Sequence, residues 1–459
     1  MTLIKSISGI RGTIGGEEGH SLTPIDIVKY TTAFADALVK GKNKKVVIGR
    51  DARISGFMLN QLVSGTLISK GIDVIDLDLS TTPTVEMAVV NERAAGGIIL
   101  TASHNPKQWN ALKLLNKKGE FISEKIGRVI INQVTNNNFN YCDIDEIGSY
   151  QKKEDYIQWH IEQILKLSLI DVSAIRKRNF TVVVDAVNST GGIAVPMLLK
   201  KLGINNIIEL YCEPTGKFPH NPEPLPEHLT DLSSAVIRYD ADFGIIVDPD
   251  VDRLAFVNEN GDMFGEEYTL VAVADYVLSK TKGNTVSNLS STRALRDITE
   301  KHGGNYSASA VGEVNVVKMM KETEAVIGGE GNGGVILPEL HYGRDALVGI
   351  ALFVSHLATK NIPISHLKAS YPNYIISKNK IELTPEINVD LILEKLQEKY
   401  KNQPINNVDG VKIEFDTEWV HLRKSNTEPI IRIYAEGNTL RVAESLVSKI
   451  KSDIKELTA

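Results

Sequence analysis

Cysteine is scarce in this sequence: only Cys142 and Cys212 occur among 459 residues, in unrelated contexts. This scarcity argues against a disulfide framework and favours a reducing, cytoplasmic location. Long hydrophobic runs are missing as well, since no apolar stretch approaches the ~20 residues that a membrane-spanning helix needs. The first residues, MTLIKSISGIRG, lack a basic region followed by a long apolar core, so we expect no signal peptide.

A strong charge of either sign is also absent. The 51 lysines and arginines nearly balance the 57 aspartates and glutamates, which gives a formal net charge of −6. Surfaces that bind nucleic acid concentrate basic residues, so this balance argues against a nucleic-acid partner. We expect a globular protein of about two to four domains. The sequence does not decide between a monomer and a homodimer.

Short apolar runs alternate with longer helical patterns, which is typical of α/β units that contain parallel strands. Opening strands are expected at 44–51, 180–187 and 283–291. Each is followed by a second strand that enters a polar loop, and these loops begin at Thr101, Asp248 and Gly328. Ligands of open α/β sheets bind at the carboxyl ends of strands, so the three loops are expected to face one cleft.

The tail has a different pattern. Antiparallel strands are expected at 411–415, 419–423 and 429–436, followed by an amphipathic helix over 439–457. This order predicts a fourth, smaller α+β domain after three related α/β domains. Shifts in composition place the four domains at 1–153, 154–256, 257–370 and 371–459.

Three aspartates follow the apolar strand FGIIV, in the sequence DPDVDR. Alternation along an extended loop would place Asp248, Asp250 and Asp252 on one side. Carboxylates that lie together repel one another unless a cation neutralises them, and all-oxygen ligation suits Mg²⁺ best. The pattern predicts a magnesium site, with Arg253 beside it to hold a phosphate. The alternative is a solvated acidic turn.

The tail loop RKSNTEP offers a guanidinium, hydroxyls, an amide and backbone N–H groups from Arg423, Ser425, Asn426 and Thr427. Such donors form anion-binding nests, and Arg432 adds a second guanidinium. A polar hairpin turn explains the same residues equally well.

The glycine-rich stretch GGEGNGG lacks the spacing of a dinucleotide or P-loop fingerprint. Glycines let the backbone approach a ligand closely. Glu330 and Asn332 could then accept hydrogen bonds from sugar hydroxyls and donate to them. The alternative is a flexible turn.

Ser103 stands in TASHNP, directly after an apolar strand. A helix cap or a serine turn is one interpretation. A Ser–His–acid hydrolase fits poorly, because the side chain of the adjacent His104 should point away and no G-x-S-x-G elbow is present. A serine near Mg²⁺ and an anion nest favours phosphoryl transfer, with Lys113 and Arg11 supplying positive charge or a proton relay.

Four motifs in order and spacing, TASHNP, DPDVDR, GGEGNGG and RKSNTEP, closely resemble those of the α-D-phosphohexomutases. That superfamily includes phosphoglucomutase, phosphomannomutase and phosphoglucosamine mutase. The resemblance covers the whole chain and implies four domains, heart-shaped around a central cleft. The segments SGIRG, GRDARISG, FPHNPEPLPEHL and VGEVNV support it.

The resemblance also implies a reaction. Ser103 would carry a phosphoryl group, give it to a hexose 6-phosphate to form a 1,6-bisphosphate, and take back the other phosphate. One Mg²⁺ would lie on Asp248, Asp250, Asp252 and a phosphoserine oxygen. The first phosphorylation of Ser103 stays open between self-phosphorylation and a hexose 1,6-bisphosphate activator. The resemblance further implies that Arg253 is an active-site arginine of the metal loop, that Arg11 lies close to the phosphoserine and that Lys113 takes part in proton transfer. Glu330 would grip sugar hydroxyls. The phosphate that is not transferred would be held by Arg423, Ser425, Asn426 and Thr427.

The chain departs from the family pattern in the glycine-rich loop at 328–334, which is called the sugar loop from here on. Asn332 and Gly334 stand where many members have Ser and His in G-E-x-S-G-H, and Glu313 stands where some have an upstream His. The tail motif S-N-T-E-P resembles the S-G-T-E-P of phosphoglucosamine mutases. This favours conversion of glucosamine 6-phosphate to glucosamine 1-phosphate, with a phosphomannomutase or phosphoglucomutase as the alternative.

Two functions of other classes compete with the mutase. A haloacid-dehalogenase-like phosphatase would use Asp248 as its nucleophile, but would leave TASHNP and SNTEP unexplained. A non-catalytic sugar-phosphate sensor would be expected to have lost Ser103 or a metal-binding aspartate, and both are present.

Overall fold

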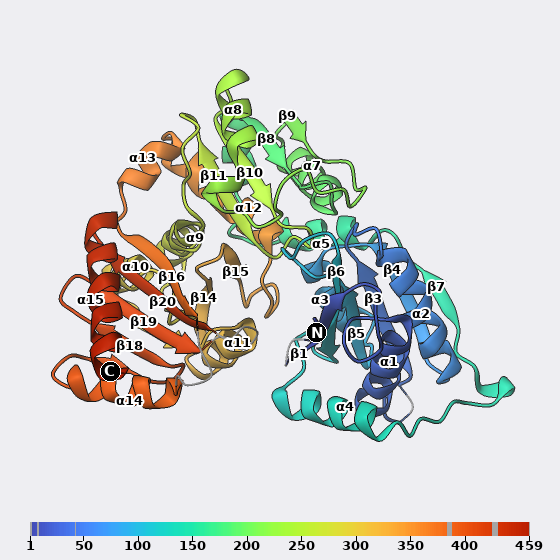
Figure 1. The fold of residues 1–459 in the computed structure, drawn as a ribbon. Coiled ribbons are helices and arrows are strands. Elements are labelled where there is room, and N and C mark those ends of the chain that lie inside the picture. The colour runs from blue at the N-terminus through green and yellow to red at the C-terminus, as the bar shows by residue number, and fades with distance from the viewer. Residues whose placement is uncertain (1, 7–8, 42, 383–387, 425–429, 459) are drawn as a thin grey trace.

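The computed structural model describes residues 2–6, 9–41, 43–382, 388–424 and 430–458 of the 459. Four sheets follow one another along the chain. They are arranged in an arc with the first and the last sheet at its two ends (Figure 1). The predicted fold class, three α/β units and a C-terminal α+β unit, is confirmed by this arrangement.

The first unit is built on a seven-stranded sheet. Its elements are β1 (Ile4–Ser6), β2 (Gly9–Thr13), α1 (Pro24–Leu38), β3 (Lys45–Arg50), α2 (Gly56–Ser69), β4 (Asp73–Leu79), α3 (Thr82–Asn91), β5 (Gly96–Leu100), β6 (Trp109–Asn116), α4 (Glu124–Asn136), the 3-10 turn Ile144–Glu146 and β7 (Tyr150–Lys152). Its strand order is β1-β2-β6-β5-β3-β4-β7, and β3 pairs in parallel with β4 and β5. Val46 and Ile48 pack under α1 and α2 while Val47 packs under α3, because successive strand residues point to opposite faces.

The second and third units each have a four-stranded sheet. The second contains α5 (Tyr156–Ile164), α6 (Val172–Arg178), β8 (Thr181–Asp185), α7 (Gly191–Leu202), β9 (Asn206–Leu210), the 3-10 turn Pro226–His228, α8 (Thr230–Arg238), β10 (Phe243–Val247) and β11 (Leu254–Asn258). The third contains α9 (Glu266–Lys280), β12 (Asn284–Asn288), α10 (Ala294–Lys301), β13 (Tyr306–Ser309), α11 (Glu313–Glu322), β14 (Ala325–Glu330), β15 (Gly334–Ile336), α12 (Ala346–Lys360) and α13 (Ile364–Ala369). In both sheets the central strands are parallel and one edge is an antiparallel hairpin.

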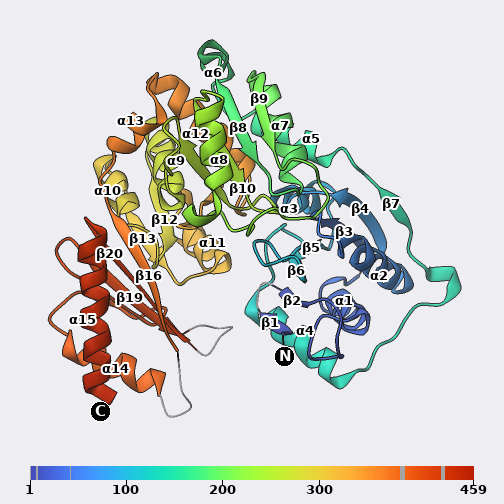
Figure 2. The ribbon, with the colours of Figure 1, turned by 45° about the horizontal axis from the view of Figure 1, so that its top comes forward.

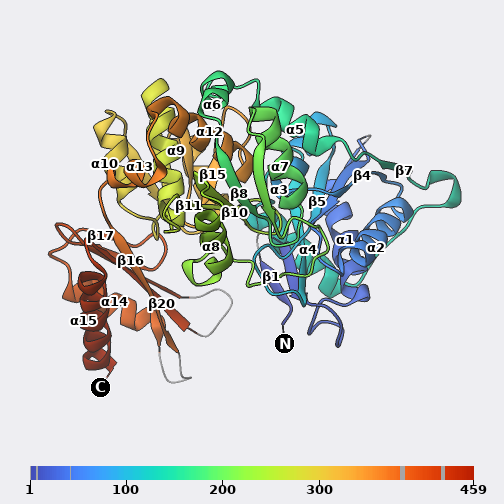
Figure 3. The ribbon, with the colours of Figure 1, turned by 90° about the horizontal axis from the view of Figure 1, so that it is seen from above.

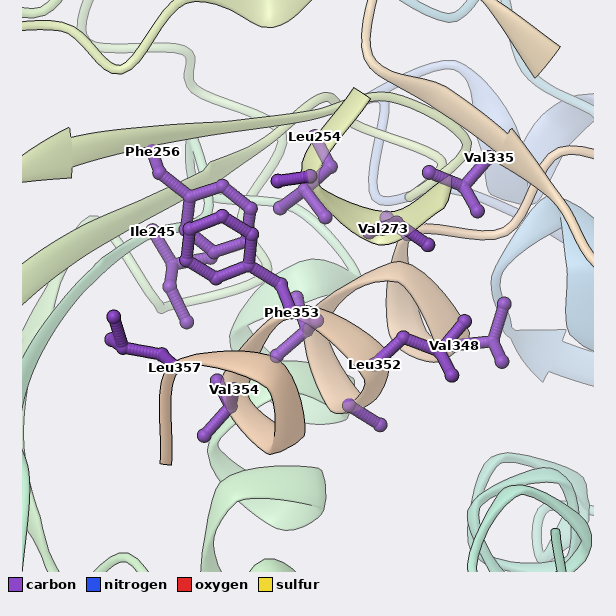
Figure 4. Close-up of a cluster of buried hydrophobic side chains, with 14 of the residues drawn as sticks. Ile245, Leu254, Phe256, Val273, Val335, Val348, Leu352, Phe353, Val354 and Leu357 are labelled. Carbon is purple, nitrogen blue, oxygen red and sulfur yellow. The ribbon is translucent and has the colours of Figure 1, made fainter. Parts of the chain in front are cut away.

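One hydrophobic core joins the second and third units. Helix α12 of the third unit packs against strands of the second, and Figure 4 shows Phe353 of this helix lying against Phe256 of β11. The two rings are stacked with centroids 3.8 Å apart and planes 15° apart. Strand β11 runs on to Asn258, past residue 256 where the second predicted domain ends, and the predicted domain bounds stay predictions.

The first unit is fixed to the third by imidazoles and carboxylates. Asp345 accepts hydrogen bonds from Leu347 N and Val348 N through Oδ1, which caps the start of α12. Its Oδ2 lies 2.9 Å from His160 Nε2 of α5 and 3.3 Å from His341 Nε2. His341 Nδ1 is 3.4 Å from Glu86 Oε2 of α3, so the cluster spans three segments that are far apart in the sequence.

The tail unit is a five-stranded antiparallel sheet in the order β16-β20-β19-β18-β17. Its elements are β16 (Ile375–Glu382), α14 (Val389–Lys399), β17 (Ile405–Asn406), β18 (Val411–Glu414), β19 (Trp419–Lys424), β20 (Ile430–Gly437) and α15 (Leu440–Thr458). Helices α14 and α15 cover the face of the sheet that is turned away from the first unit (Figures 2 and 3). No helix within the described ranges is both long and apolar enough to span a bilayer.

Candidate active site

Ser103 lies in the loop that follows β5. Its backbone φ is 50°, in the left-handed region, and its N–H donates to Thr101 Oγ1 at 2.9 Å. Its hydroxyl donates to Asp248 Oδ2 at 2.6 Å, so the first and second units meet at this bond. The expectation that His104 points away is wrong: its Nδ1 is 3.4 Å from Ser103 Oγ, because the left-handed turn brings the two side chains to the same side.

Arg53 binds the backbone of the loop that carries Ser103, a role that the sequence did not predict. Its fully buried guanidinium donates to the carbonyl oxygens of Pro106 and Trp109, both at 2.9 Å, and to those of Ser103 and Asn105. It also pairs with Asp51 at 3.1 Å. Burial raises the pKa of Asp51 to about 6 although Arg53 opposes this. A buried arginine with this many carbonyl partners fixes the loop that presents the serine.

The three aspartates converge, but not along an extended loop as predicted. Val251 has a φ of 62°, and the N–H groups of Asp252 and Arg253 both donate to Asp248 Oδ1 at 3.1 Å. The chain therefore turns around Asp248. Carboxylate oxygens of Asp248, Asp250 and Asp252 lie within 4.8 Å of one another, and all three side chains are fully buried.

The oxygens of this cluster divide into two sets. Lys113 Nζ donates to Asp250 Oδ2 at 2.6 Å and to Asp252 Oδ2 at 3.0 Å. Thr82 also donates to Asp250 Oδ2, and Arg344 Nη2 donates to Asp252 Oδ2 at 2.7 Å. The Oδ1 atoms of Asp250 and Asp252 are buried and have no hydrogen-bond partner. Since unpaired buried carboxylate oxygens are costly, two of them beside the Ser103–Asp248 pair fit a hard divalent cation such as Mg²⁺.

Burial and neighbouring charges shift the pKa values of the residues in this cluster. Burial, together with the charges of Asp250 and Asp252, raises the pKa of Asp248 well above its usual range. Burial would also raise the pKa of Asp252, but Arg344 and Lys113 lower it below its usual range. Burial would lower the pKa of Lys113, but the charges of Asp250 and Asp252 raise it above its usual range. Lys113 of the first unit and Arg344 of the third unit thus bind the Oδ2 atoms of Asp250 and Asp252.

Two arginines lie beside the serine loop. Arg11 Nη1 donates to Asn105 Oδ1 at 3.2 Å, and burial together with the charge of Arg253 lowers the pKa of Arg11. Arg253 Nη1 donates to Glu223 Oε1 at 2.9 Å, in the loop FPHNPEPLPEHL. Neighbouring guanidinium groups of like charge favour an anion between them. Glu223, which the sequence did not single out, fixes Arg253.

The sugar loop is shorter than the sequence predicted. Strand β14 ends at Glu330 and β15 begins at Gly334, so the first glycines are part of a strand. Glu330 Oε1 accepts from Asn288 Nδ2 at 2.9 Å and from Gly312 N at 3.0 Å. Asn332 Oδ1 accepts from Gly334 N at 3.2 Å and stabilises the turn.

Arg344 connects the sugar loop with the aspartates and was missed by sequence reasoning. Its Nη1 donates to Glu330 Oε2 at 2.9 Å, its Nε donates to Glu313 Oε2 at 3.0 Å, and Nη2 reaches Asp252. The side chain is 10% exposed. Only the fold places this residue, which precedes α12, next to loops from two units.

Arg423 and Arg432 of the tail face one another as register partners in β19 and β20. Burial lowers the pKa of Arg423, and the charge of Arg432 lowers it further. The other predicted members of the phosphate loop, Ser425, Asn426 and Thr427, lie outside the described residues.

Family models match all four units. They are described as phosphoglucomutase/phosphomannomutase α/β/α domain I at residues 3–141, domain II at 158–261, domain III at 265–374 and the C-terminal domain at 384–452. The chain belongs to the phosphoglucomutase/phosphomannomutase family. The predicted resemblance to α-D-phosphohexomutases is thereby confirmed, and the protein is an enzyme of this mutase family.

Relatives in this family match nearly the whole chain. A phosphoglucomutase/phosphomannomutase of Thermococcus kodakarensis is 36% identical over 94% of this chain and 94% of its own. A phosphoglucosamine/phosphogalactosamine mutase of Sulfurisphaera tokodaii is 32% identical over 97% of this chain and 98% of its own. The crystal structure of a phosphoglucomutase/phosphomannomutase family protein from Burkholderia thailandensis has a TM-score of 0.84 at 26% identity, covering 99% of this chain and 97% of that one.

Proposed function

We propose that the protein interconverts a hexose 6-phosphate and the corresponding hexose 1-phosphate through phosphorylated Ser103 and a 1,6-bisphosphate. The observation that carries this proposal is the 2.6 Å hydrogen bond from Ser103 to Asp248, inside a buried carboxylate cluster with two unpaired oxygens. A serine held against a metal-binding cluster is suited to carry a phosphoryl group.

In the first step the sugar C1 hydroxyl attacks the phosphorus atom of phosphoserine 103. A new P–O bond to the sugar forms as the P–O bond to Ser103 breaks, and the proton of the sugar hydroxyl leaves to a base. The Ser103 oxygen takes up a proton as it leaves. In the second step the Ser103 hydroxyl loses its proton and attacks the phosphorus of the 6-phosphate, the P–O bond to the C6 oxygen breaks, and the C6 oxygen takes up a proton. Ser103 loses a phosphoryl group in the first step and regains one in the second. Each step releases one proton and takes up one, so phosphoryl groups and protons balance over the cycle.

The residues of the cluster would have distinct tasks. Asp248, Asp250 and Asp252 would hold Mg²⁺, which when bound neutralises charge on the phosphoryl oxygens. Lys113, Arg11 and Arg253 would surround the transferring group with positive charge, and we propose Lys113 for the proton transfer that the family resemblance implies. Further proposed contacts are Glu330 and Asn332 with sugar hydroxyls, and Arg423, Ser425, Asn426, Thr427 and Arg432 with the phosphate that is not transferred.

Glucosamine 6-phosphate is the proposed substrate, and its product is glucosamine 1-phosphate. The tail motif SNTEP supports this choice. Both a phosphoglucosamine/phosphogalactosamine mutase and a phosphoglucomutase/phosphomannomutase are similar to the chain at comparable identity, so glucose and mannose phosphates are the alternatives. Such sugars differ at C2, which is worth only a few kcal/mol in binding.

A coupled mutase assay tests the proposal. The wild type and Ser103→Ala would be compared on glucosamine, glucose, mannose and N-acetylglucosamine phosphates, with Mg²⁺ and a trace of hexose 1,6-bisphosphate. Ser103→Ala should lower turnover at least about 1000-fold, because no phosphoryl carrier remains. Ser123→Ala, at an exposed helix cap of the same unit, is the control and should retain activity. A rate that survives the loss of Ser103 contradicts the mechanism, whereas a rate highest on glucose or mannose phosphate contradicts only the choice of sugar.

A further inference from the structure

Arg344 makes one ion pair with each of three carboxylates that belong to three different segments. Asp252 lies in the aspartate loop, Glu313 begins α11, and Glu330 ends β14. The distances are 2.7, 3.0 and 2.9 Å, and a different guanidinium nitrogen serves each partner. A guanidinium is planar and rigid, so its three partners cannot move independently while these bonds persist.

The space for this side chain exists because residue 334 is glycine. A Cβ atom at Gly334 would lie 2.3 Å from Arg344 Cδ and 3.0 Å from Cγ. These atoms are in the middle of the side chain, so the clash could not be relieved by moving its tip alone. The absence of a side chain at 334 and the position of Arg344 are therefore two parts of one arrangement.

Arg344 also decides which oxygen of Asp252 is left for a cation. Oδ2 is occupied by Arg344 and by Lys113, while Oδ1 is buried without a partner. The same guanidinium holds Glu330 Oε2, so the orientation of the sugar-loop carboxylate is set by the group that sets Asp252.

We propose that Arg344 is a positioning residue that couples the metal-binding aspartates to the sugar-binding loop. Neutralising Glu330 weakens its bond to Arg344. The guanidinium then interacts more strongly with Asp252 Oδ2, and less negative charge is left for a divalent cation at Asp252 Oδ1. This inference deepens the proposed function and rests on it for the identity of the sugar ligand. The coupling itself is a property of the binding sites and requires no turnover.

Calorimetric titration of the full-length, dephosphorylated protein with Mg²⁺ tests the coupling directly. The four proteins are the wild type, Glu330→Gln, Arg344→Met and the double variant. Glu330→Gln should weaken Mg²⁺ binding about threefold or more in the wild-type background, and by less than about 1.5-fold when Arg344 is Met. An equal effect of Glu330→Gln in both backgrounds would overturn the proposal.

A second measurement separates positioning from simple stabilisation. Arg344→Met leaves Glu313 and Glu330 buried without their cation, which destabilises the fold, and adding Glu313→Gln removes part of that penalty. In Arg344→Met/Glu313→Gln we expect the melting temperature to recover in part, while binding of glucosamine 6-phosphate stays at least about tenfold weaker than in the wild type. Arg344→Lys should not restore that binding, since one ammonium group cannot hold three carboxylates at fixed angles. Recovery of both stability and binding would reduce Arg344 to a structural residue and overturn the proposal.

The glycine provides an independent control. Gly334→Ala should displace Arg344 and weaken binding of glucosamine 6-phosphate, whereas the same change in an Arg344→Ala background should add little. Additive effects would contradict the shared space. If the mutase assay failed while the Mg²⁺ coupling through Arg344 was found, the proposed reaction would fall and the coupling would stand.

Discussion

The two acidic clusters on either side of Arg344 differ in how their oxygens are used. Around Asp248, Asp250 and Asp252, two buried carboxylate oxygens have no hydrogen-bond partner. In Glu313 and Glu330 every carboxylate oxygen accepts a hydrogen bond from Arg344, Asn288 or Gly312. The first cluster is therefore incomplete without a cation. In the second cluster every carboxylate oxygen already has a hydrogen-bond donor, and one of these hydrogen bonds can be exchanged for one from a neutral hydroxyl without any change in charge.

Removing one carboxylate from the open cluster should give the largest effect. Asp250→Asn removes an unpaired oxygen and one negative charge, so Mg²⁺ should no longer raise the melting temperature and turnover should fall at least about 100-fold. Thermal unfolding with and without Mg²⁺, together with kcat, measures both. Asp231→Asn, which changes a carboxylate paired with Tyr211 on the surface of the same unit, is the matched control. An unchanged Mg²⁺ response in Asp250→Asn would contradict the metal assignment.

Removing a carboxylate from the closed cluster should act on the sugar instead. Glu330→Gln keeps the shape of the side chain but weakens its bond to Arg344, and we expect KM for the hexose phosphate to rise about tenfold or more. The affinity for Mg²⁺ should change only a few-fold. Steady-state kinetics at saturating Mg²⁺ gives KM for the sugar, and the calorimetric titration described above gives the affinity for Mg²⁺. A variant that loses Mg²⁺ binding without a change in KM would contradict the assignment of this cluster to the sugar.

The sequence predicts the loops that carry Ser103 and the three aspartates, because each of these loops lies directly after an apolar strand. Glu313, at the start of α11, meets Glu330 at the end of β14 only through the fold. Ser103 and Asp248, 145 positions apart, meet at hydrogen-bonding distance as the three-loop hypothesis requires. Arg53 and Arg344 could not be found in this way. Their partners are carbonyls and carboxylates of distant segments, and a single arginine in a sequence carries no sign that it will be buried.

A third pair of buried carboxylates, Glu86 and Asp345, differs from both clusters because its partners are imidazoles. His341 lies between the two carboxylates, and His160 contacts Asp345. Burial would lower the pKa of His341, but Asp345 and Glu86 raise it to about 10. A histidine has a pKa near 6.5 when unfolded, so its contribution to stability is complete below about pH 6.5 and is lost as pH rises through about 10. Burial raises the pKa of Glu86 to about 8, which acts in the same direction because folding favours its protonated form.

The melting temperature should therefore fall by several degrees between about pH 7 and pH 10. His341→Gln should flatten this dependence, whereas His366→Gln, at an exposed position, should leave it unchanged. Differential scanning calorimetry across this range would test the prediction. A profile of the same slope in His341→Gln would show that other groups control alkaline stability.

The smallest effect is expected where a carboxylate is paired in solvent. Arg128 and Glu124 form an i,i+4 pair on α4 with side chains 76% and 56% exposed. Water screens such pairs, so Arg128→Ala should change the melting temperature by less than about 1 °C. A larger shift would mean that burial is not what separates the clusters described above from ordinary surface pairs.

The core shared by the second and third units has a consequence for exchanging parts between relatives. Helix α12 begins at Ala346, whose N–H donates to Val251 O in the aspartate loop, and the same helix carries the Phe353 ring stacked on Phe256. A chimera that replaced only the sugar-loop unit would cut this core and pair one half with a foreign surface. Grafting a new sugar preference onto this scaffold therefore calls for a joint exchange of both units, or for substitutions confined to the loop itself.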